Sequence, residues 1–331
     1  MQRLTVLGGG TGSYTILKSL KNLNVAIDSI VNMSDNGGSS GVLRDELGVL
    51  PPGDIRQCLV ALSSKLEIRQ LFNYRFQTGS LSGQSLGNII LSGLSLQYDS
   101  FSKAVEIASE ILQIKGRVIP VTLQQNQLVL SIQNKIIIGE HKINNYHFNN
   151  HQPQLTLKPK SSLNPIAKNS ILNAKFIVIA PGNIFCSIVP IFLVDQIKQT
   201  IHQSQAKIIL LINLMNNFNH TNNWHVQDYI NQFQSLIKPK KIDFVVYNNN
   251  LPSKLVLKNY AKENEFPVRI NQNDFKNNQN IQLIATDLLS NEITIQDPAD
   301  LIPRTLIRHD GRKVLKIIKS IIALERNNYK I

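Results

Sequence analysis

Six short runs of apolar and β-branched residues recur along this chain, each bounded by turn-forming residues. Runs that are apolar on both faces are typical of strands in a parallel sheet with helices on both sides. Helical patterns over residues 14–23, 55–74, 101–112 and 315–325 complete the alternation, which predicts an α/β fold with a doubly wound, mainly parallel sheet. The expected strands are RLTVLG from Arg3, AIDSIVNM from Ala26, KFIVIA from Lys175, AKIILLINL from Ala206, KIDFVVYN from Lys241 and IQLIATDLL from Ile281.

The middle of the chain has a different period. Within residues 117–157, the stretch VIPVTLQQNQLVLSIQNKIIIGEHKI alternates apolar and polar residues. This alternation indicates antiparallel strands with one exposed face. We therefore expect a single α/β domain over residues 1–331 that contains a β-rich antiparallel insertion at 117–157.

The formal charge of +13 comes from 35 Lys and Arg against 22 Asp and Glu. Such an excess suits nucleic acid, an anionic membrane surface or acidic small molecules. Here the basic residues are scattered, no block of five or more like charges occurs, and Asn, Lys and Ile are abundant throughout. We therefore expect no nucleic-acid surface, whereas a nucleotide or an acidic metabolite fits this charge.

Neither the cysteines nor the most apolar segment indicates a secreted or membrane protein. Cys58 and Cys186 are the only cysteines, which predicts neither a disulfide framework nor a zinc site. The uncharged segment 176–194 is long enough to span a bilayer, but Pro181-Gly182-Asn183 and Pro190 interrupt it. A buried strand, a tight turn and an apolar helix explain it better, and we expect a cytoplasmic protein.

The first predicted strand runs into a glycine-rich turn, GGGTG, over residues 8–12. Glycines between a strand and a helix let backbone N–H groups approach an anion at the positive end of the helix. Position 13 is Ser, so the spacing differs from the GxGxxG of dinucleotide-binding folds, and the Lys of a P-loop is absent. The hypothesis of an NAD-dependent oxidoreductase therefore rests on this loop alone. Close packing of the strand against the helix is an alternative explanation for the glycines.

A second small-residue loop, NMSDNGGSSG over residues 32–41, follows the second predicted strand. Loops at the carboxyl ends of neighbouring strands converge on one crevice in a doubly wound sheet. The two loops together predict a phosphate-binding site in which Asp35 accepts a hydrogen bond from a ribose hydroxyl or holds a divalent cation through water. The alternative is that Asp35 caps the following turn.

Three further segments carry polar or small residues toward the same predicted crevice. PPGDIR presents Asp54 and Arg56 on a stiff loop, although Asp54 is also a candidate helix N-cap. SGQSLGN, residues 82–88, opens a helix with small residues, and APGN, residues 180–183, follows the third predicted strand.

The histidines give little support for catalysis. His309, between Arg308 and Asp310, is the best candidate, with helix capping by Asp310 as the competing explanation. His141, His147, His151 and His220 fall in polar loops, where we expect solvated side chains. No GxSxG, HExxH or defensible Ser/His/Asp set occurs, so we assign no catalytic residue and no metal ligand.

Several motifs in a fixed order are more specific than any one of them. They are GGGTG, SDNGGSSGVLRDELGVLPPGDIRQCLVAL, YRF with LSGQSLGN, GRVIPVT, IAPGN with SIVP, NLM, and RHD at residues 308–310. In this set the chain resembles the gluconeogenesis factor (YvcK-like) family within the 2-phospho-L-lactate transferase (CofD-like) superfamily. The resemblance covers almost the whole chain.

This resemblance implies a Rossmann-like CofD fold and a cytoplasmic bacterial protein required for normal cell shape on gluconeogenic carbon. It also implies binding of UDP-sugars, notably UDP-N-acetylglucosamine, and a protein partner in the control of cell-wall precursor synthesis. Carried over to this sequence, the ligand-binding residues are Gly9, Gly10, Thr11, Gly12, Asp35, Gly37, Gly38, Ser39, Asp54, Arg56, Asn88, Gly182, Asn183 and Asn213.

The chain departs from the family pattern at four places. Asn36 and Gln84 replace an Asp and a His, APGN stands for GPGS, and NNFNHT at 216–221 stands for TQPGET. We therefore favour a non-catalytic regulator that binds a nucleotide-sugar. Such a protein could also form homo-oligomers. The alternative is a CofD-like transferase that moves a nucleotide-linked phospholactyl-type group with Mg²⁺ near Asp35.

Overall fold

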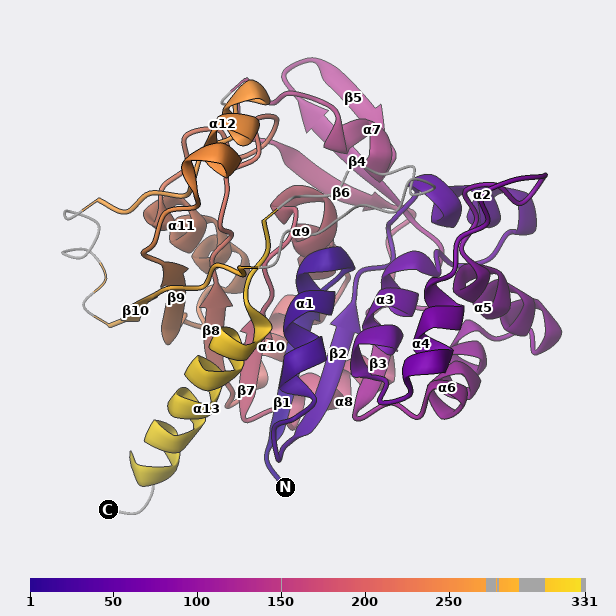
Figure 1. Ribbon diagram of the computed structural model, residues 1–331, viewed down its shortest axis with the longest axis horizontal. Helices are drawn as coiled ribbons and strands as arrows, with labels where there is room; N and C mark the ends of the chain where they lie inside the picture. Colours follow the sequence, from indigo (N-terminus) through magenta and orange to yellow (C-terminus); the bar gives the residue numbers. More distant parts are fainter. Residues whose placement is uncertain (150, 272–277, 279, 292–306, 329–331) are drawn as a thin grey trace.

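A seven-stranded parallel sheet forms the centre of the molecule, with the order β10-β9-β8-β7-β1-β2-β3 (Figure 1). The structure is a computed structural model that describes residues 1–149, 151–271, 278, 280–291 and 307–328. All six predicted strands are present, and the predicted doubly wound parallel sheet is confirmed. The strands are β1 (Arg3–Gly8), β2 (Ala26–Val31), β3 (Arg117–Pro120), β7 (Phe176–Ile179), β8 (Lys207–Leu211), β9 (Phe244–Asn248) and β10 (Gln282–Thr286).

Helices cover both faces of this sheet. In Figure 1, α1, α3 and α13 lie in front of the strands, and α8 and α10 lie behind them. The helices are α1 (Gly10–Leu20), α2 (Gly38–Leu47), α3 (Gly53–Leu62), α4 (Leu66–Asn73), α5 (Leu86–Gln97), α6 (Phe101–Leu112), α7 (Glu140–Asn144), α8 (Pro165–Leu172), the π-helix η1 (Ile184–Ile188), α9 (Val189–Leu193), α10 (Ile197–Gln203), α11 (Val226–Ile237), α12 (Lys254–Lys262) and α13 (Gly311–Asn328).

The prediction of a single helix over residues 55–74 is wrong, because the chain forms α3 and α4 with a break between them. Ser63 ends α3 in an extended conformation. Its hydroxyl donates to the Leu112 carbonyl at 2.6 Å and accepts from the Lys65 amide at 3.2 Å. This tertiary contact, which periodicity cannot reveal, sets the helix boundary.

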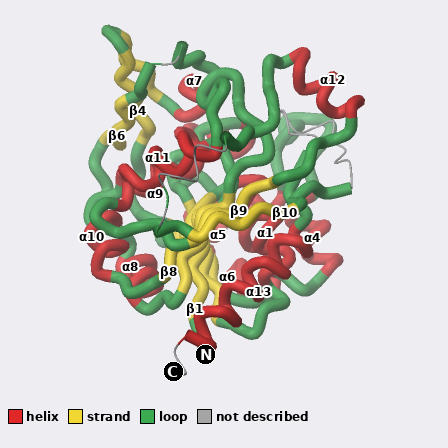
Figure 2. The backbone as a smooth tube through the Cα atoms, turned by 90° about the vertical axis from the view of Figure 1, so that its left-hand side faces the viewer, coloured by secondary structure: helices red, strands yellow, loops and turns green. Residues whose placement is uncertain are grey.

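The predicted antiparallel insertion is present, but its antiparallel strands begin at Gln127 and not at residue 117. Residues 117–120 form β3, which pairs in parallel with β2 at the edge of the main sheet. The antiparallel sheet has the order β5-β4-β6 and projects beyond the carboxyl ends of the main strands (Figure 2). Its strands are β4 (Gln127–Ile132), β5 (Lys135–Ile138) and β6 (Gln154–Lys158).

The order of the main sheet places its topological switch point between β1 and β7. The chain proceeds from β1 to β2 and β3 on one side, and returns to β7, β8, β9 and β10 on the other. Connections after β1 and β7 therefore leave in opposite directions, and the carboxyl ends of strands at such a switch point are where sheets of this kind form a ligand crevice.

The opposite end of the sheet is held by one buried carboxylate. Asp28 on β2 is 2% exposed and accepts two bonds from Arg117 on β3, at 2.8 and 2.7 Å, and one from Arg3 on β1 at 2.5 Å. Burial alone raises the pKa of Asp28, but bonds from Arg117, Ser170 and Arg3 outweigh it and hold that pKa below its usual value. The ion pair thus joins three adjacent strands.

Replacement of Asp28 by Asn should lower the free energy of unfolding by about 3 kcal/mol at pH 7, because two arginines lose a buried counter-charge. Since the folded-state pKa is depressed, this stability is present above the unfolded pKa of about 4 and disappears as the pH falls through the folded value. Urea denaturation at pH 7 and pH 3 measures both effects. Glu46→Gln, on the exposed side of α2, is the control. An equal loss of unfolding free energy in both variants would contradict a stabilising role of the Asp28 ion pair.

A candidate ligand crevice between the glycine loops

The loop between β1 and α1 contains glycines for two different reasons. A Cβ on Gly9 would lie 2.2 Å from the Asp54 carboxylate, and one on Gly12 would lie 1.9 Å from the Pro181 carbonyl oxygen. Gly9 and Gly12 therefore permit close packing. Gly10 differs, because it has a φ of +61° and a Cβ there would meet only the Asp54 carboxylate, at 3.5 Å. Gly10 is thus the glycine that leaves space open in the crevice.

The loop after β2 is organised by Asp35. Its Oδ1 atom accepts from the Gly37 amide at 2.9 Å, so the expected turn-capping contact is present. Gly37 is the N-cap of α2, and Gly38 begins that helix with a φ of +47°. The Oδ2 atom of Asp35 is directed toward Gly53, because a Cβ added to Gly53 would lie 3.3 Å from it. The turn-capping bond of Asp35 therefore uses its Oδ1 atom.

Asp54 is not a helix N-cap, contrary to one interpretation of the sequence. Pro52 takes that position in α3, and Asp54 lies in the first turn. Its carboxylate lies against Gly9 and Gly10, at the start of α1. Asp54 therefore brings the beginnings of α1 and α3 together.

Ser39, Arg56 and Asn88 form a polar network beneath the second loop. Arg56 is 6% exposed; its Nε donates to the Asn88 side-chain oxygen at 2.9 Å, and its guanidinium also donates to Asn73 at 2.6 Å. Asn88 in turn donates to the Ser39 hydroxyl at 3.0 Å, and Ser39 donates to Gln84 at 2.7 Å. In this arrangement the three predicted residues connect α2, α3 and α5 and support the loop from below.

Four helices begin around this crevice. Contacts of Asp54 with Gly9 join the starts of α3 and α1, and the Ser85 amide, at the start of α5, donates to Ser39 on the first turn of α2 at 3.3 Å. At α1, α2, α3 and α5 the side chain of the N-cap residue itself makes no capping hydrogen bond. Each helix start carries roughly half a positive charge, so their convergence favours an anion.

The far wall comes from the strands beyond the switch point. Asn213, after β8, accepts from the Gly182 amide at 3.1 Å and donates to the Gly182 carbonyl at 2.8 Å. Asn183 caps η1 by accepting from the Cys186 amide at 3.2 Å. The structure thus brings Gly182, Asn183 and Asn213 together, and confirms a turn and an apolar helix after the β7 strand.

Sequence reasoning missed the short helix α7, which folds from the insertion onto the crevice. The Asn36 side chain accepts from the His141 amide at 2.7 Å, and Asn183 donates to the Asn144 side chain at 2.6 Å. His220 donates through Nε2 to the Ile143 carbonyl at 2.9 Å. The insertion is therefore fixed to the second loop, to η1 and to the Asn-rich loop after β8.

The prediction that His220 is solvated is wrong. Its side chain is 6% exposed and packs against Phe148, with ring centroids 4.4 Å apart. Burial lowers the pKa of His220 to about 4, so the ring is neutral at physiological pH. An Asn-rich sequence gave no signal for this burial, because it depends on where α7 docks.

Helix α7 also brings Glu140 to the crevice. Burial raises the pKa of the Glu140 carboxyl to about 8, and the nearby charges of Asp35 and Asp54 act in the same direction. Burial likewise raises the pKa of the Cys186 thiol, which contacts the Glu140 carbonyl at 3.9 Å. Glu140 is consequently protonated at neutral pH and can donate a hydrogen bond beside two carboxylates. No local pattern in the sequence distinguishes it from the other acidic residues.

His309, the histidine considered for a functional role from the sequence, has a structural role in the fold. Its Nε2 donates to the Ile212 carbonyl at 3.0 Å, and burial lowers the pKa of His309 to about 4. Asp310 accepts from the Arg312 amide at 2.8 Å and from the Lys313 amide at 3.4 Å, which confirms that it caps α13.

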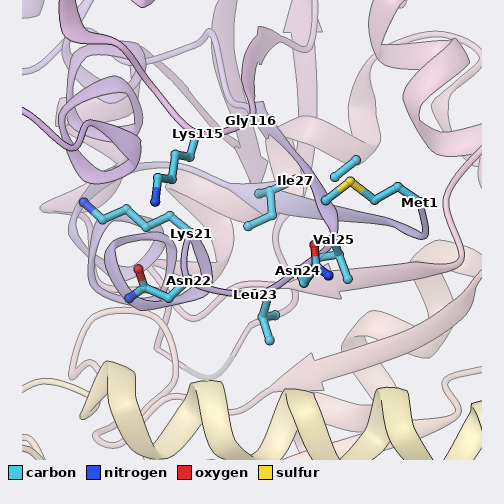
Figure 3. A pocket seen from close by; sticks show the side chains of 10 residues that line it. Met1, Lys21, Asn22, Leu23, Asn24, Val25, Ile27, Lys115 and Gly116 are labelled. Carbon is cyan, nitrogen blue, oxygen red and sulfur yellow. The ribbon is translucent and has the colours of Figure 1, made fainter.

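Two hollows lie away from the crevice. One, of about 640 Å³, is at the amino ends of β2 and β3, where Figure 3 shows Lys21 and Lys115 near each other. The other, of about 650 Å³, runs beside β3 and α6. Neither of these two hollows marks the candidate site, which is defined by the convergence of loops and helix starts.

The residues that the structure describes contain neither a metal-binding cluster nor a membrane-spanning helix. There, no three His, Cys, Asp or Glu side chains are placed so that they could hold a metal ion. In the same residues, none of the helices has both the length and the apolar character to cross a bilayer.

The parallel sheet, its switch point and the glycine loops define a Rossmann-like α/β protein with an anion-attracting crevice. The family model described as 2-phospho-L-lactate transferase CofD matches residues 4–289. The chain therefore belongs to the gluconeogenesis factor family within the CofD superfamily, as its motifs predicted.

Relatives match over two thirds or more of their own length. A Thermotoga maritima protein is 37% identical over 322 residues, which cover 96% of this chain and 99% of its own. The gluconeogenesis factor of Halalkalibacterium halodurans is 34% identical over 278 residues, covering 83% of this chain and 86% of that protein. The crystal structure of a UPF0052 family member from Bacillus halodurans superposes with a TM-score of 0.86 at 30% identity, covering 96% and 98% of the two chains.

Glu140→Gln should make the protein more stable at high pH. The folded-state pKa of about 8 lies above the unfolded value, so ionisation of Glu140 removes stability as the pH rises from about 4.5 to 8. At pH 9 the variant should exceed the wild type by roughly 2–4 kcal/mol, and below pH 5 the two should agree. Guanidinium denaturation at both pH values measures this, with exposed Glu67→Gln as the control. A constant difference across the range would show that Glu140 titrates normally.

Proposed function

We propose that this protein is a regulatory nucleotide-sugar-binding protein with the role that its relatives' designation as gluconeogenesis factors describes. The observation that carries this proposal is the convergence of four helix starts with the carboxyl groups of Asp35, Asp54 and Glu140. The resemblance stated above implies UDP-N-acetylglucosamine as the ligand, and a role in cell shape and in the control of cell-wall precursor synthesis.

A nucleotide-sugar has the two kinds of group that such a crevice favours. Phosphate oxygens suit backbone N–H groups at a glycine loop, where Gly10 leaves room for close approach. Ribose and sugar hydroxyls suit carboxylates that accept hydrogen bonds, such as that of Asp35. The chemistry of the residues present therefore fits a ligand that carries both groups better than it fits an isolated phosphate.

Regulation requires that the ligand favours one conformation over another. Helix α7 touches the second loop through Asn36 and η1 through Asn183. A ligand that contacts Asp35 or Glu140 would therefore act on the position of the insertion. A protein partner that contacts the insertion would sense whether the crevice is filled.

The second candidate is a CofD-type transferase, favoured by the match to the transferase family. A magnesium ion would supply charge neutralisation at the phosphates of a nucleotide-linked donor. Asp35 and Asp54 are the residues of this chain that would help to hold it, together with the ligand's own phosphates. No side chain is assigned to proton transfer in that reaction.

Isothermal titration calorimetry with UDP-N-acetylglucosamine, beside NAD and with or without Mg²⁺, decides between these functions. The regulator should bind the UDP-sugar saturably, independently of Mg²⁺ and without turnover. Binding that requires Mg²⁺, or heat that continues after saturation, would favour the transferase. Binding of NAD alone would contradict both.

Gly10→Leu should abolish UDP-N-acetylglucosamine binding and leave the fold intact, because the new side chain points into the open part of the crevice. Gly48→Leu is the matched control. Gly48 ends α2 with a φ of +67° and has nothing within 4 Å of its Cβ position, so it adds comparable backbone strain away from the crevice. Loss of affinity only in the Gly10 variant would support a role of the glycine loop in ligand binding. Normal affinity in both variants would exclude that role.

A further inference from the structure

The hollow at the amino ends of β2 and β3 is lined by two lysines. Its volume is about 640 Å³, and small-molecule sites have volumes of about 300–1,000 Å³. Figure 3 shows the side chains of Lys21 and Lys115 near each other. The amide side chains of Asn22 and Asn24 also line the hollow. It lies at the opposite end of the sheet from the glycine loops, so it is separate from the crevice.

The end of α3 fixes both lysines in place. The ammonium group of Lys21, directly after α1, donates to the Ser63 carbonyl, and the Lys115 amide donates to the Leu62 carbonyl at 3.0 Å. Gly116 has a φ of +113°, and a Cβ there would lie 2.5 Å from a carbonyl oxygen of β2. Glycine therefore allows the turn that carries Lys115 to lie against β2. The two lysines are brought together by the fold rather than by chance on an open surface.

Four cations gather here, and we call Lys18, Lys21, Arg69 and Lys115 the amino-end cluster. Burial is the main cause that lowers the pKa of Lys21 to about 8, and the charges of the other three cations act in the same direction. Among the described residues, no member of the cluster makes an ion pair, and the buried Nε of Arg69 has no hydrogen-bond partner. The end of α3 supplies only about half a negative charge. Most of the positive charge of the cluster is therefore left for an anion.

We propose that this hollow binds a small soluble molecule that carries a phosphate or diphosphate group, held by the ammonium groups of Lys21 and Lys115. A phosphate group carries about two negative charges at neutral pH, so it gains more from several cations than a single carboxylate does. Lysine binds phosphate as a point charge with three N–H donors, of which Lys21 uses one on α3. The amides of Asn22 and Asn24 suit the hydroxyls of a sugar or nucleoside attached to that phosphate.

Isothermal titration calorimetry of the full-length protein with inorganic pyrophosphate tests this site. The Gly10→Leu variant serves as the background, because its crevice is blocked and the hollow is intact. Pyrophosphate should bind saturably, and adding Lys21→Met or Lys115→Met should weaken binding by about tenfold or more. Lys198→Met is the charge-matched control, since it removes an exposed lysine from α10 on the other face of the sheet.

Three outcomes of this titration would overturn the proposal. They are the absence of saturable binding, an equal loss of affinity in the Lys198 control, and binding to phosphatidylglycerol vesicles without binding of pyrophosphate. The second outcome would show general attraction by a positive chain, and the third would assign the amino-end cluster to a membrane surface. With Gly10 intact, Lys21→Met should bind UDP-N-acetylglucosamine normally, so the hollow and the proposed function can fail independently.

Protection from acetylation locates the bound anion. Lys21 is partly deprotonated at pH 8, so acetic anhydride should modify it readily at that pH. Bound pyrophosphate favours the ammonium form and covers it, so it should slow acetylation of Lys21 and Lys115. Acetylation of Lys198 should not change, and mass spectrometry of peptides measures all three rates. An unchanged rate at Lys21 under saturating pyrophosphate would overturn the assignment of the anion to this hollow.

Discussion

The convergence of several helix starts is the constraint on which the crevice depends. A parallel sheet covered on both faces sends every connection from its carboxyl edge into a helix, so helix starts accumulate there. In this chain α1, α2, α3 and α5 begin close together, and none of their N-cap residues makes a side-chain capping bond. Asp54 crosses from one helix start to another, and Asp35 uses one oxygen on its own loop. The acids and the glycines are two parts of one electrostatic arrangement.

The insertion belongs to the same arrangement. Its helix α7 is too short to be stable alone, and tertiary bonds from Asn36, Asn183 and His220 hold it. These residues come from three different connections of the main sheet, so α7 can take this position only when all three loops are formed. Glu140 is protonated at neutral pH as a consequence of that burial.

The sequence predicted what depends on local pattern. Buried strands, the helix over 101–112, the glycine loops and the capping role of Asp310 all follow from residue type and spacing. Glu140 and the buried state of His220 could not be predicted, since both depend on how the insertion docks. The break between α3 and α4 was missed for a similar reason, because a hydroxyl contact between Ser63 and Leu112 sets it. Arg56 and Asn88 were predicted from their motifs, but spacing could not show that they bond to each other and, through Ser39, join α2, α3 and α5.

The charge distribution narrows the ligands that suit the crevice. The chain as a whole carries +13, which attracts anions from a distance. Near the helix starts, however, Asp35 and Asp54 add negative charge that repels a bare phosphate at short range. A ligand with hydroxyls beside its phosphates can satisfy both regions, because the hydroxyls donate to the carboxylates while backbone N–H groups receive the phosphates. Glu140, held protonated mainly by its burial and further by those two carboxylates, adds a donor where further negative charge would weaken binding. The burial of this third acid therefore makes the crevice compatible with an anionic ligand.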